Sequence, residues 1–183
     1  MSLPDRSSRV VAAVLLLLAC APRARAQEEV PPSRAADPGD VASLDAIIAA
    51  FYDVVSGPAG EPRDWGRDST LYLLGVRFTV IRPGPDGTPV ARTLDHGTWA
   101  AAAAPSLERG FFEREIHRTV RRFGPIADAF STYEWSRTAE GPPEGRGINS
   151  LQLFHDGTRW WITAALWADE GPGAPIPPEY LPD

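Results

Sequence analysis

The residues best suited to chemistry lie in the segment FFEREIHRTVRRFGPIADAFSTYEWS, residues 111 to 136. Glu115 and His117 are two positions apart on a predicted strand, so a regular strand would place both side chains on one face. Asp128 lies on the next predicted strand. A histidine with a carboxylate partner can transfer protons near pH 7, and burial can raise a carboxyl pKa into that range. The catalytic candidates are therefore His117, Glu115 and Asp128.

The alternative is that these groups form a solvated ladder of charges across an antiparallel sheet, where ion pairs are common. If the two strands join tightly at residues 124–125, Arg121 lies opposite Asp128 as a favourable ion pair. The same register puts Glu115 opposite Glu134, where two carboxylates would repel. Either a β-bulge shifts the register between these positions or one carboxylate is protonated, and a bulge is the simpler explanation. Both interpretations of the polar residues stay open on the sequence alone.

Aromatic residues provide the candidates for a ligand pocket. The chain contains six tryptophans, which can line a pocket for an apolar or ring-shaped molecule, although core packing accounts for many of them. The candidate ligand-binding residues are Tyr52, Trp65, Trp99, His117, Tyr133 and Trp167.

No metal or cofactor site is expected. Glu115 and His117 could share a metal, but His96 and His155 lie at no recognisable ligand spacing. Ser131 has no neighbouring base in a known motif, and the scattered glycines form no phosphate-binding loop.

The chain predicts helices first and strands later. Residues 40–57 show helical spacing of apolar residues, with Asp40 or Ser43 as the cap and Gly57 as the stop. A second helix is expected from Trp65 to Leu73, and an alanine-rich helix ends at Pro105. A strand followed by a hairpin is expected at residues 76–81. Further strands are expected at 111–123, 126–138, 148–155 and 159–168.

The turn at residues 156–157 reads as a two-residue hairpin that pairs His155 with Thr158. This pairing puts Leu153 opposite Trp160 on one apolar face. The expected class is α+β, with N-terminal helices packed on a strongly curved, mostly antiparallel sheet.

The two ends of the chain read as segments outside the folded domain. Residues 1–26 have a basic start, an apolar run and the small-residue cleavage pattern ARA, which together predict a secretory signal peptide and hence a periplasmic or secreted protein. The alternative is a lipoprotein anchored at Cys20, the only cysteine. Residues 27–40 are expected to form a flexible linker, 41–170 the domain and 171–183 a proline-rich tail.

Charge argues against nucleic acid as a partner. The full chain carries a net charge of −6, and the basic leader leaves −9 on the rest. Binding to phosphates or anionic lipid needs positive charge. The apolar run of the leader is too short for a transmembrane span.

Several segments together resemble the NTF2-like superfamily in its SnoaL-like branch. These are AFYDVV in the first helix, DWGRDSTLYLLGVRFTVI after it, and RGINSLQLFHDGTRWWITAALW near the end. The resemblance covers residues 41–169. It implies a cone-shaped α+β domain with an open-mouthed pocket, and a habit of dimerising through the sheet.

The same resemblance leaves the activity open, because this fold serves isomerases, cyclases, dehydratases and non-catalytic binders. Steroid-isomerase-like members use a tyrosine on the first helix, which Tyr52 matches, but Asp68 and Asp128 do not convincingly match their acidic residues. The sequence therefore favours an exported domain that binds a small, mainly apolar molecule, with a homodimer as a possible assembly. The alternatives are a cofactor-independent isomerase, dehydratase or cyclase that uses a pocket histidine or carboxylate, and a non-catalytic interaction module.

Overall fold

The computed structural model describes residues 34–183 of the chain. The predicted signal peptide, its alternative lipidation site at Cys20 and the first half of the predicted linker lie outside the described residues. The first element in the described residues is α1 (Pro38–Val41), which includes the last residues of the predicted linker. In the described part of the chain, no helix is both long enough and apolar enough to cross a bilayer.

The first predicted helix is present as α2 (Leu44–Asp53), but it is shorter than residues 40–57 and ends before Gly57. Ser43 caps it, since its Oγ accepts the Ala46 N–H at 3.0 Å. Ile47, Ile48 and Phe51 recur at helical spacing and are buried, so one face of α2 packs on the sheet.

The next two helices differ from the predicted ranges. Helix α3 (Trp65–Ser69) is shorter than expected, because the chain at Leu71 already pairs with a strand: its carbonyl accepts the Ile162 N–H at 3.0 Å. Helix α4 (His96–Leu107) continues through Pro105. A proline near the last turn removes only one helical hydrogen bond, so the helix ends two residues later than predicted.

Six strands form one sheet: β1 (Tyr72–Pro83), β2 (Pro89–Leu94), β3 (Phe112–Phe123), β4 (Ile126–Ser136), β5 (Gly145–His155) and β6 (Trp160–Asp169). Their order is β2-β1-β6-β5-β4-β3. All neighbours are antiparallel except β1 and β6, which are parallel. The α+β class and the mostly antiparallel sheet are thus confirmed.

The hairpin between β5 and β6 is wider than the sequence predicted. His155 pairs with Trp160 rather than with Thr158, and Leu153 pairs with Ile162. The Asp156 carboxylate accepts three hydrogen bonds from Thr158 and Arg159 and a fourth from the Trp161 ring nitrogen, which stabilises a four-residue turn. Because the register moves by two residues, the same side chains still face the core.

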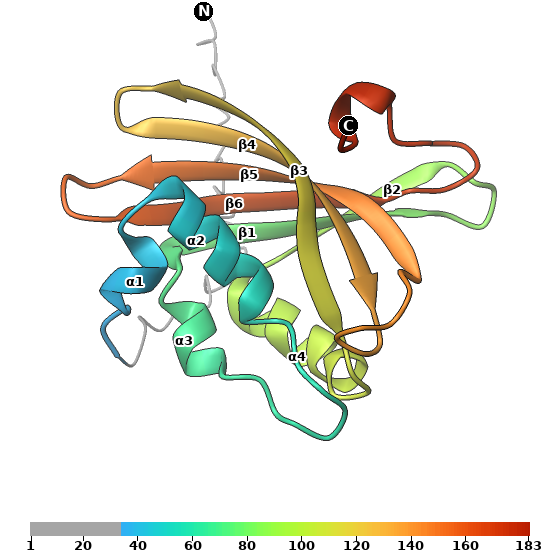
Figure 1. Cartoon of the computed structure of the whole chain (residues 1–183), viewed down its shortest axis with the longest axis horizontal. Coiled ribbons are helices and arrows are strands. Elements are labelled where there is room, and N and C mark those ends of the chain that lie inside the picture. Colours follow the sequence, from blue (N-terminus) through green and yellow to red (C-terminus); the bar gives the residue numbers. More distant parts are fainter. Residues whose placement is uncertain (1–33) are drawn as a thin grey trace, which may run out of the picture.

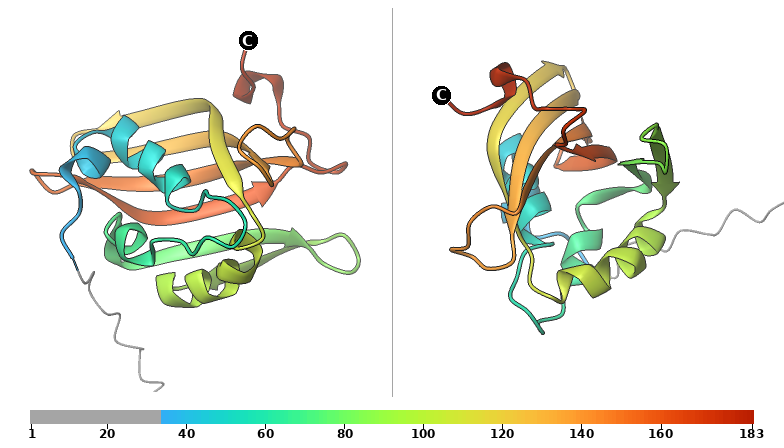
Figure 2. Two further views of the ribbon diagram at one scale, coloured as in Figure 1. Left: turned by 60° about the horizontal axis from the view of Figure 1, so that its bottom comes forward. Right: turned by 90° about the vertical axis from the view of Figure 1, so that its right-hand side faces the viewer.

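The sheet separates two unequal layers (Figures 1 and 2). The helices α1 to α4 lie on one face, called the inner face here, and the C-terminal segment with the short 3-10 helix η1 (Pro178–Tyr180) lies on the other, the outer face. Tyr180 contacts Phe130 on the outer face, with ring centroids 4.9 Å apart. Strands β1 and β2 bend away from β3 to β5, so the inner face is concave toward α2 and α4 (Figure 2).

Candidate functional site

A cavity of about 750 Å³ lies between the inner face of the sheet, α2 and α4. Its wall is mainly apolar. Phe78 of β1 and Trp99 of α4 stack face to face with ring centroids 4.8 Å apart. The cavity has the size and lining of sites that hold one small organic molecule. Its main apolar side chains are Phe78, Val80, Trp99, Leu107, Phe111 and Trp167.

Acidic and hydroxyl groups gather at one end of this cavity. The Tyr133 hydroxyl donates to Asp169 Oδ1 at 2.6 Å, and Asp169 also pairs with Arg82. Burial and the hydrogen bond to Asp169 raise the pKa of Tyr133, so this hydroxyl stays protonated.

Glu113 of β3 projects at the same end. Burial, and then the nearby charge of Asp169, raise the pKa of Glu113 to about 8. No side-chain hydrogen bond from the described residues holds its carboxyl group. At neutral pH Glu113 is therefore mainly a neutral carboxylic acid, which can donate a hydrogen bond or a proton into the cavity.

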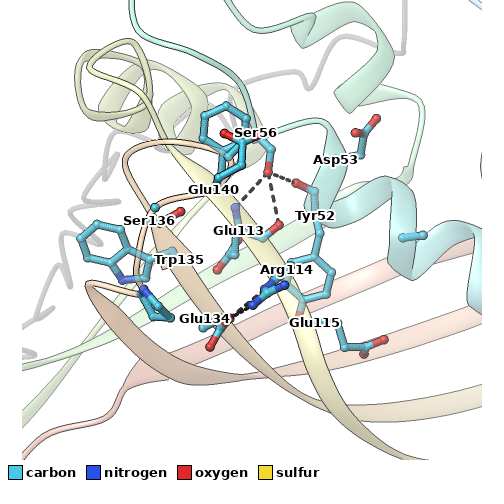
Figure 3. Close-up of a pocket in the computed structure, with 15 residues that line it drawn as sticks. Tyr52, Asp53, Ser56, Glu113, Arg114, Glu115, Glu134, Trp135, Ser136 and Glu140 are labelled. Carbon is cyan, nitrogen blue, oxygen red and sulfur yellow. Dashed lines mark hydrogen bonds and ion pairs between the residues drawn. The ribbon is translucent and has the colours of Figure 1, made fainter.

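Glu113 also lines a second hollow of about 590 Å³, beside the end of α2 (Figure 3). Ser56 fixes the backbone here: its Oγ accepts the Glu113 N–H at 3.0 Å and donates to the Tyr52 carbonyl at 2.8 Å. Arg114 pairs with Glu134 at the rim. Ser56 thus ties the end of α2 to the start of β3, which positions Glu113 between the two hollows.

A chain of buried polar groups runs beneath α2. Asn149 Nδ2 donates to Tyr52 Oη at 3.2 Å, Tyr52 Oη lies 2.6 Å from Ser131 Oγ, and Ser131 donates to Glu115 Oε1 at 2.5 Å. Arg118 lies 3.7 Å from the same Glu115 oxygen. Burial and the charge of Glu113 raise the pKa of Tyr52, so its hydroxyl also stays protonated. This row of hydrogen bonds connects a partly buried ion pair to the cavity wall at Asn149.

The predicted bulge in β3 is confirmed, and it separates two of the catalytic candidates. Glu115 pairs with Tyr133, whereas His117 pairs with Thr132, so Ile116 is the extra residue. Paired residues share a face and neighbours on β4 alternate. Glu115 therefore points to the inner face and His117 to the outer face, and the expectation that they share one face is wrong.

Asp128 also lies on the outer face, where it pairs with Arg121 at 3.2 Å in the predicted register. Its side chain is 37% exposed. The structure thus brings neither His117 nor Asp128 to the cavity. Glu115 belongs to the polar chain behind the cavity wall.

The aromatic residues predicted to bind a ligand lie in three different places. Trp99, Tyr133 and Trp167 line the cavity. Tyr52 lines the second hollow and contacts the cavity through Asn149. Trp65 packs edge-on against Trp99, with ring centroids 5.8 Å apart, and supports the wall from behind.

The polar residues of the cavity that the sequence did not predict include Glu113, Asn149 and Asp169. Glu113 could have been found, because it lies two positions before Glu115 on the same face, ahead of the bulge. Asn149 and Asp169 sit on late strands whose register was not predicted correctly, and no local motif marks them.

No protein-family model matches the sequence, and no curated protein matches it. Solved structures do match. A protein of unknown function from Nostoc punctiforme has a TM-score of 0.55 at 10% identity, covering 72% of this chain and 91% of that chain. LinA has a TM-score of 0.52 at 10% identity, with coverage of 75% and 92%.

A candidate dehydratase of the NTF2-like family from Streptomyces avermitilis has a TM-score of 0.51 at 17% identity, covering 72% of this chain and 96% of that chain. At such low identities the likeness concerns the fold alone. The element order, the curved sheet and these matches agree with one another, and the chain has an NTF2-like fold.

Proposed function

We propose that this protein is exported and that it binds one small, mainly apolar molecule in the cavity between the sheet and α4. The observation that carries the proposal is the cavity itself, about 750 Å³ with a mainly apolar wall that also carries acidic, amide, hydroxyl and arginine side chains. Aromatic walls supply affinity for ring compounds, while the polar groups orient them. The leader-like start of the sequence supports export.

A dye titration tests binding. N-phenyl-1-naphthylamine is neutral, and its emission rises in apolar surroundings. We expect saturable binding of one dye per chain. Ala103 of α4 lines the cavity, and Ala103→Trp should fill it and abolish most of the signal. Ala101 is an exposed residue of the same helix outside the cavity lining, so Ala101→Trp is the matched control and should leave binding unchanged. Equal binding by both variants would contradict the proposal.

The second candidate is a cofactor-independent enzyme in which Glu113 transfers a proton. The observation that favours it is an unpartnered carboxyl group at the polar end of an apolar cavity, with a pKa raised to about 8. General acids and bases work best when their pKa lies near the working pH. In this reading Glu113, not His117, is the catalytic group.

The ring opening of 5-nitrobenzisoxazole tests this candidate, because the reaction needs only a base. The base takes the ring C–H proton, and the N–O bond breaks to release a cyanophenolate. The rate should rise as pH increases through about 8, where Glu113 ionises, and Glu113→Gln should abolish the rise. A rate that Glu113→Gln leaves unchanged would remove Glu113 from any catalytic role.

A further inference from the structure

Asn149 of β5 is a buried amide at the cavity wall whose oxygen is unused. The residue is 4% exposed and lines the cavity. Its Nδ2 donates to Tyr52, but within residues 34–183 nothing donates a hydrogen bond to its Oδ1. Among the described residues, Arg118 Nη1 is the one buried side-chain N or O atom without a hydrogen-bond partner. Asn149 Oδ1 is therefore not sealed inside the protein and stays accessible to a donor that comes from the cavity.

The polar chain behind the wall fixes which way this amide points. Ser131 donates its single hydroxyl proton to Glu115 Oε1, which lies beside the Arg118 guanidinium. Ser131 Oγ must then accept from the Tyr52 hydroxyl. The Tyr52 oxygen in turn accepts from the only donor that Asn149 has, its NH₂ group.

Each of these hydrogen bonds has one allowed direction, which is set by the bond that Ser131 donates to the Glu115 carboxylate. A flipped amide would place Oδ1 against the Tyr52 oxygen, whose proton is already used on Ser131, and the two acceptors would repel. Three of the four members, Tyr52, Ser131 and Asn149, are buried, which strengthens these bonds and limits rearrangement. The chain therefore holds the amide with its oxygen available to the cavity.

We propose that Asn149 Oδ1 is the specificity-determining acceptor of the cavity, and that the ligand presents a hydroxyl or N–H donor to it. Glu115, Ser131 and Tyr52 are positioning residues that act through the amide. The inference rests on the proposed binding function and narrows it. Aromatic or cyclic alcohols, phenols and amines fit the site, whereas plain hydrocarbons and ethers of the same size leave the amide oxygen unpaired.

Two competitors of the dye differ in this one property. 2-Naphthol has a donor hydroxyl, and 2-methoxynaphthalene has the same ring and oxygen without the donor. Because a neutral hydrogen bond in a buried site changes affinity by about 3- to 10-fold, we expect the wild-type protein to prefer 2-naphthol by about that factor. The measured quantity is the ratio of the two inhibition constants against N-phenyl-1-naphthylamine.

Three variants separate positioning from packing. Asn149→Leu keeps the size of the side chain and should bring the ratio close to one. Tyr52→Phe removes the hydroxyl that orients the amide and should also reduce the ratio, whereas a merely structural role would weaken both competitors equally. Tyr72→Phe is the control, because this buried tyrosine donates to Asp68 and takes no part in the hydrogen bonds that lead to Asn149. The ratio of inhibition constants for this variant should equal that of the wild type. Thermal unfolding confirms that each variant is folded.

The outcomes distinguish this inference from the function on which it rests. If the dye binds and wild type shows no preference for 2-naphthol, the role of Asn149 is wrong while the binding function stands. A preference that persists in Asn149→Leu has the same meaning. If no dye enters the cavity of the wild-type protein, the binding function fails and the inference falls with it.

Discussion

The raised pKa of Glu113 makes a prediction about stability that needs no ligand. In an unfolded chain this carboxyl group has an ordinary pKa of 4.5, and burial in the folded protein raises it to about 8. Glu113→Gln replaces the neutral acid with a neutral amide of the same shape. The variant therefore lacks the one property at issue, the ability to ionise inside the cavity.

The sign and size of the effect follow from proton linkage. Between pH 4.5 and about 8 the folded protein holds a proton that the unfolded chain releases. The free energy of unfolding of wild type should therefore fall as the pH rises through this range and level off above it. The two pKa values set an upper limit of about 5 kcal/mol, at about 1.4 kcal/mol per pH unit. Water in the open cavity lowers the free-energy cost of ionising Glu113, so we expect the stability of wild type to fall by about 2–4 kcal/mol.

Urea unfolding at a series of pH values from about 5 to about 9 measures the difference. Glu113→Gln and wild type should be about equally stable near pH 5, and the variant should become more stable than wild type toward pH 9. Glu140 lines the same second hollow but is exposed, so Glu140→Gln is the matched control and should track wild type at every pH.

Two results would refute the reasoning. If the stability difference between Glu113→Gln and wild type does not change with pH, the carboxyl group is not desolvated and cannot be the proton donor of the cavity. If the variant loses stability as the pH rises, the ionised form is the one that the fold stabilises, and the sign of the pKa change is wrong.

Three further substitutions test how the site is supported. Arg63 is buried and its guanidinium donates to four backbone carbonyls. Arg63→Met removes all four bonds, although the Gly57 and Leu107 carbonyls each keep one backbone N–H donor, and should destabilise the fold by about 3–5 kcal/mol in urea unfolding. In Gly147→Ala the new Cβ would lie 2.3 Å from the Tyr133 hydroxyl and 2.5 Å from a backbone carbonyl oxygen, which should cost about 1–3 kcal/mol and weaken dye binding; unchanged binding would show that this hydroxyl does not shape the cavity. Tyr180→Ala removes the ring contact with Phe130 on the outer face and should cost about 1–2 kcal/mol with no effect on dye binding, so a loss of binding would contradict the separation of the two faces.

Much of the fold was predictable because local patterns determined it. Ser43 and the apolar spacing after it define α2, and the repulsion between Glu115 and Glu134 in a regular register favoured the bulge that β3 contains. The ends of elements were less predictable when a distant strand decided them. Leu71 leaves the helical conformation to pair with β6, a contact between residues about ninety positions apart that no local signal records.

The site was predictable only in part, for a related reason. The sequence indicated a pocket wall, and Trp99, Tyr133 and Trp167 do line the cavity. It also favoured His117, since histidine titrates near pH 7 without help. The bulge that the charges demanded is what turns His117 to the outer face. Glu113 gains its chemistry from burial beside Asp169, which depends on the tertiary structure and not on residue type.

The outer face bears on the predicted homodimer, which stays a prediction. In the structure, the C-terminal segment already occupies part of this face: Thr132 Oγ1 donates to the Tyr180 carbonyl at 2.6 Å, and Ile176 is buried. A dimer through the sheet would have to use the remaining outer surface or displace this segment.

The most direct test of the binding function is a two-dimensional ¹H–¹⁵N spectrum of the tryptophan indole groups during titration with 2-naphthol. Trp99, Trp135 and Trp167 line the cavity, whereas the Trp161 indole bonds Asp156 in the β5–β6 loop. Single Trp→Phe variants assign the peaks. The proposed function predicts saturable shifts of the three cavity signals with Trp161 unmoved. Shifts confined to Trp161 would contradict it, and so would the absence of shifts at a 2-naphthol concentration that displaces the dye.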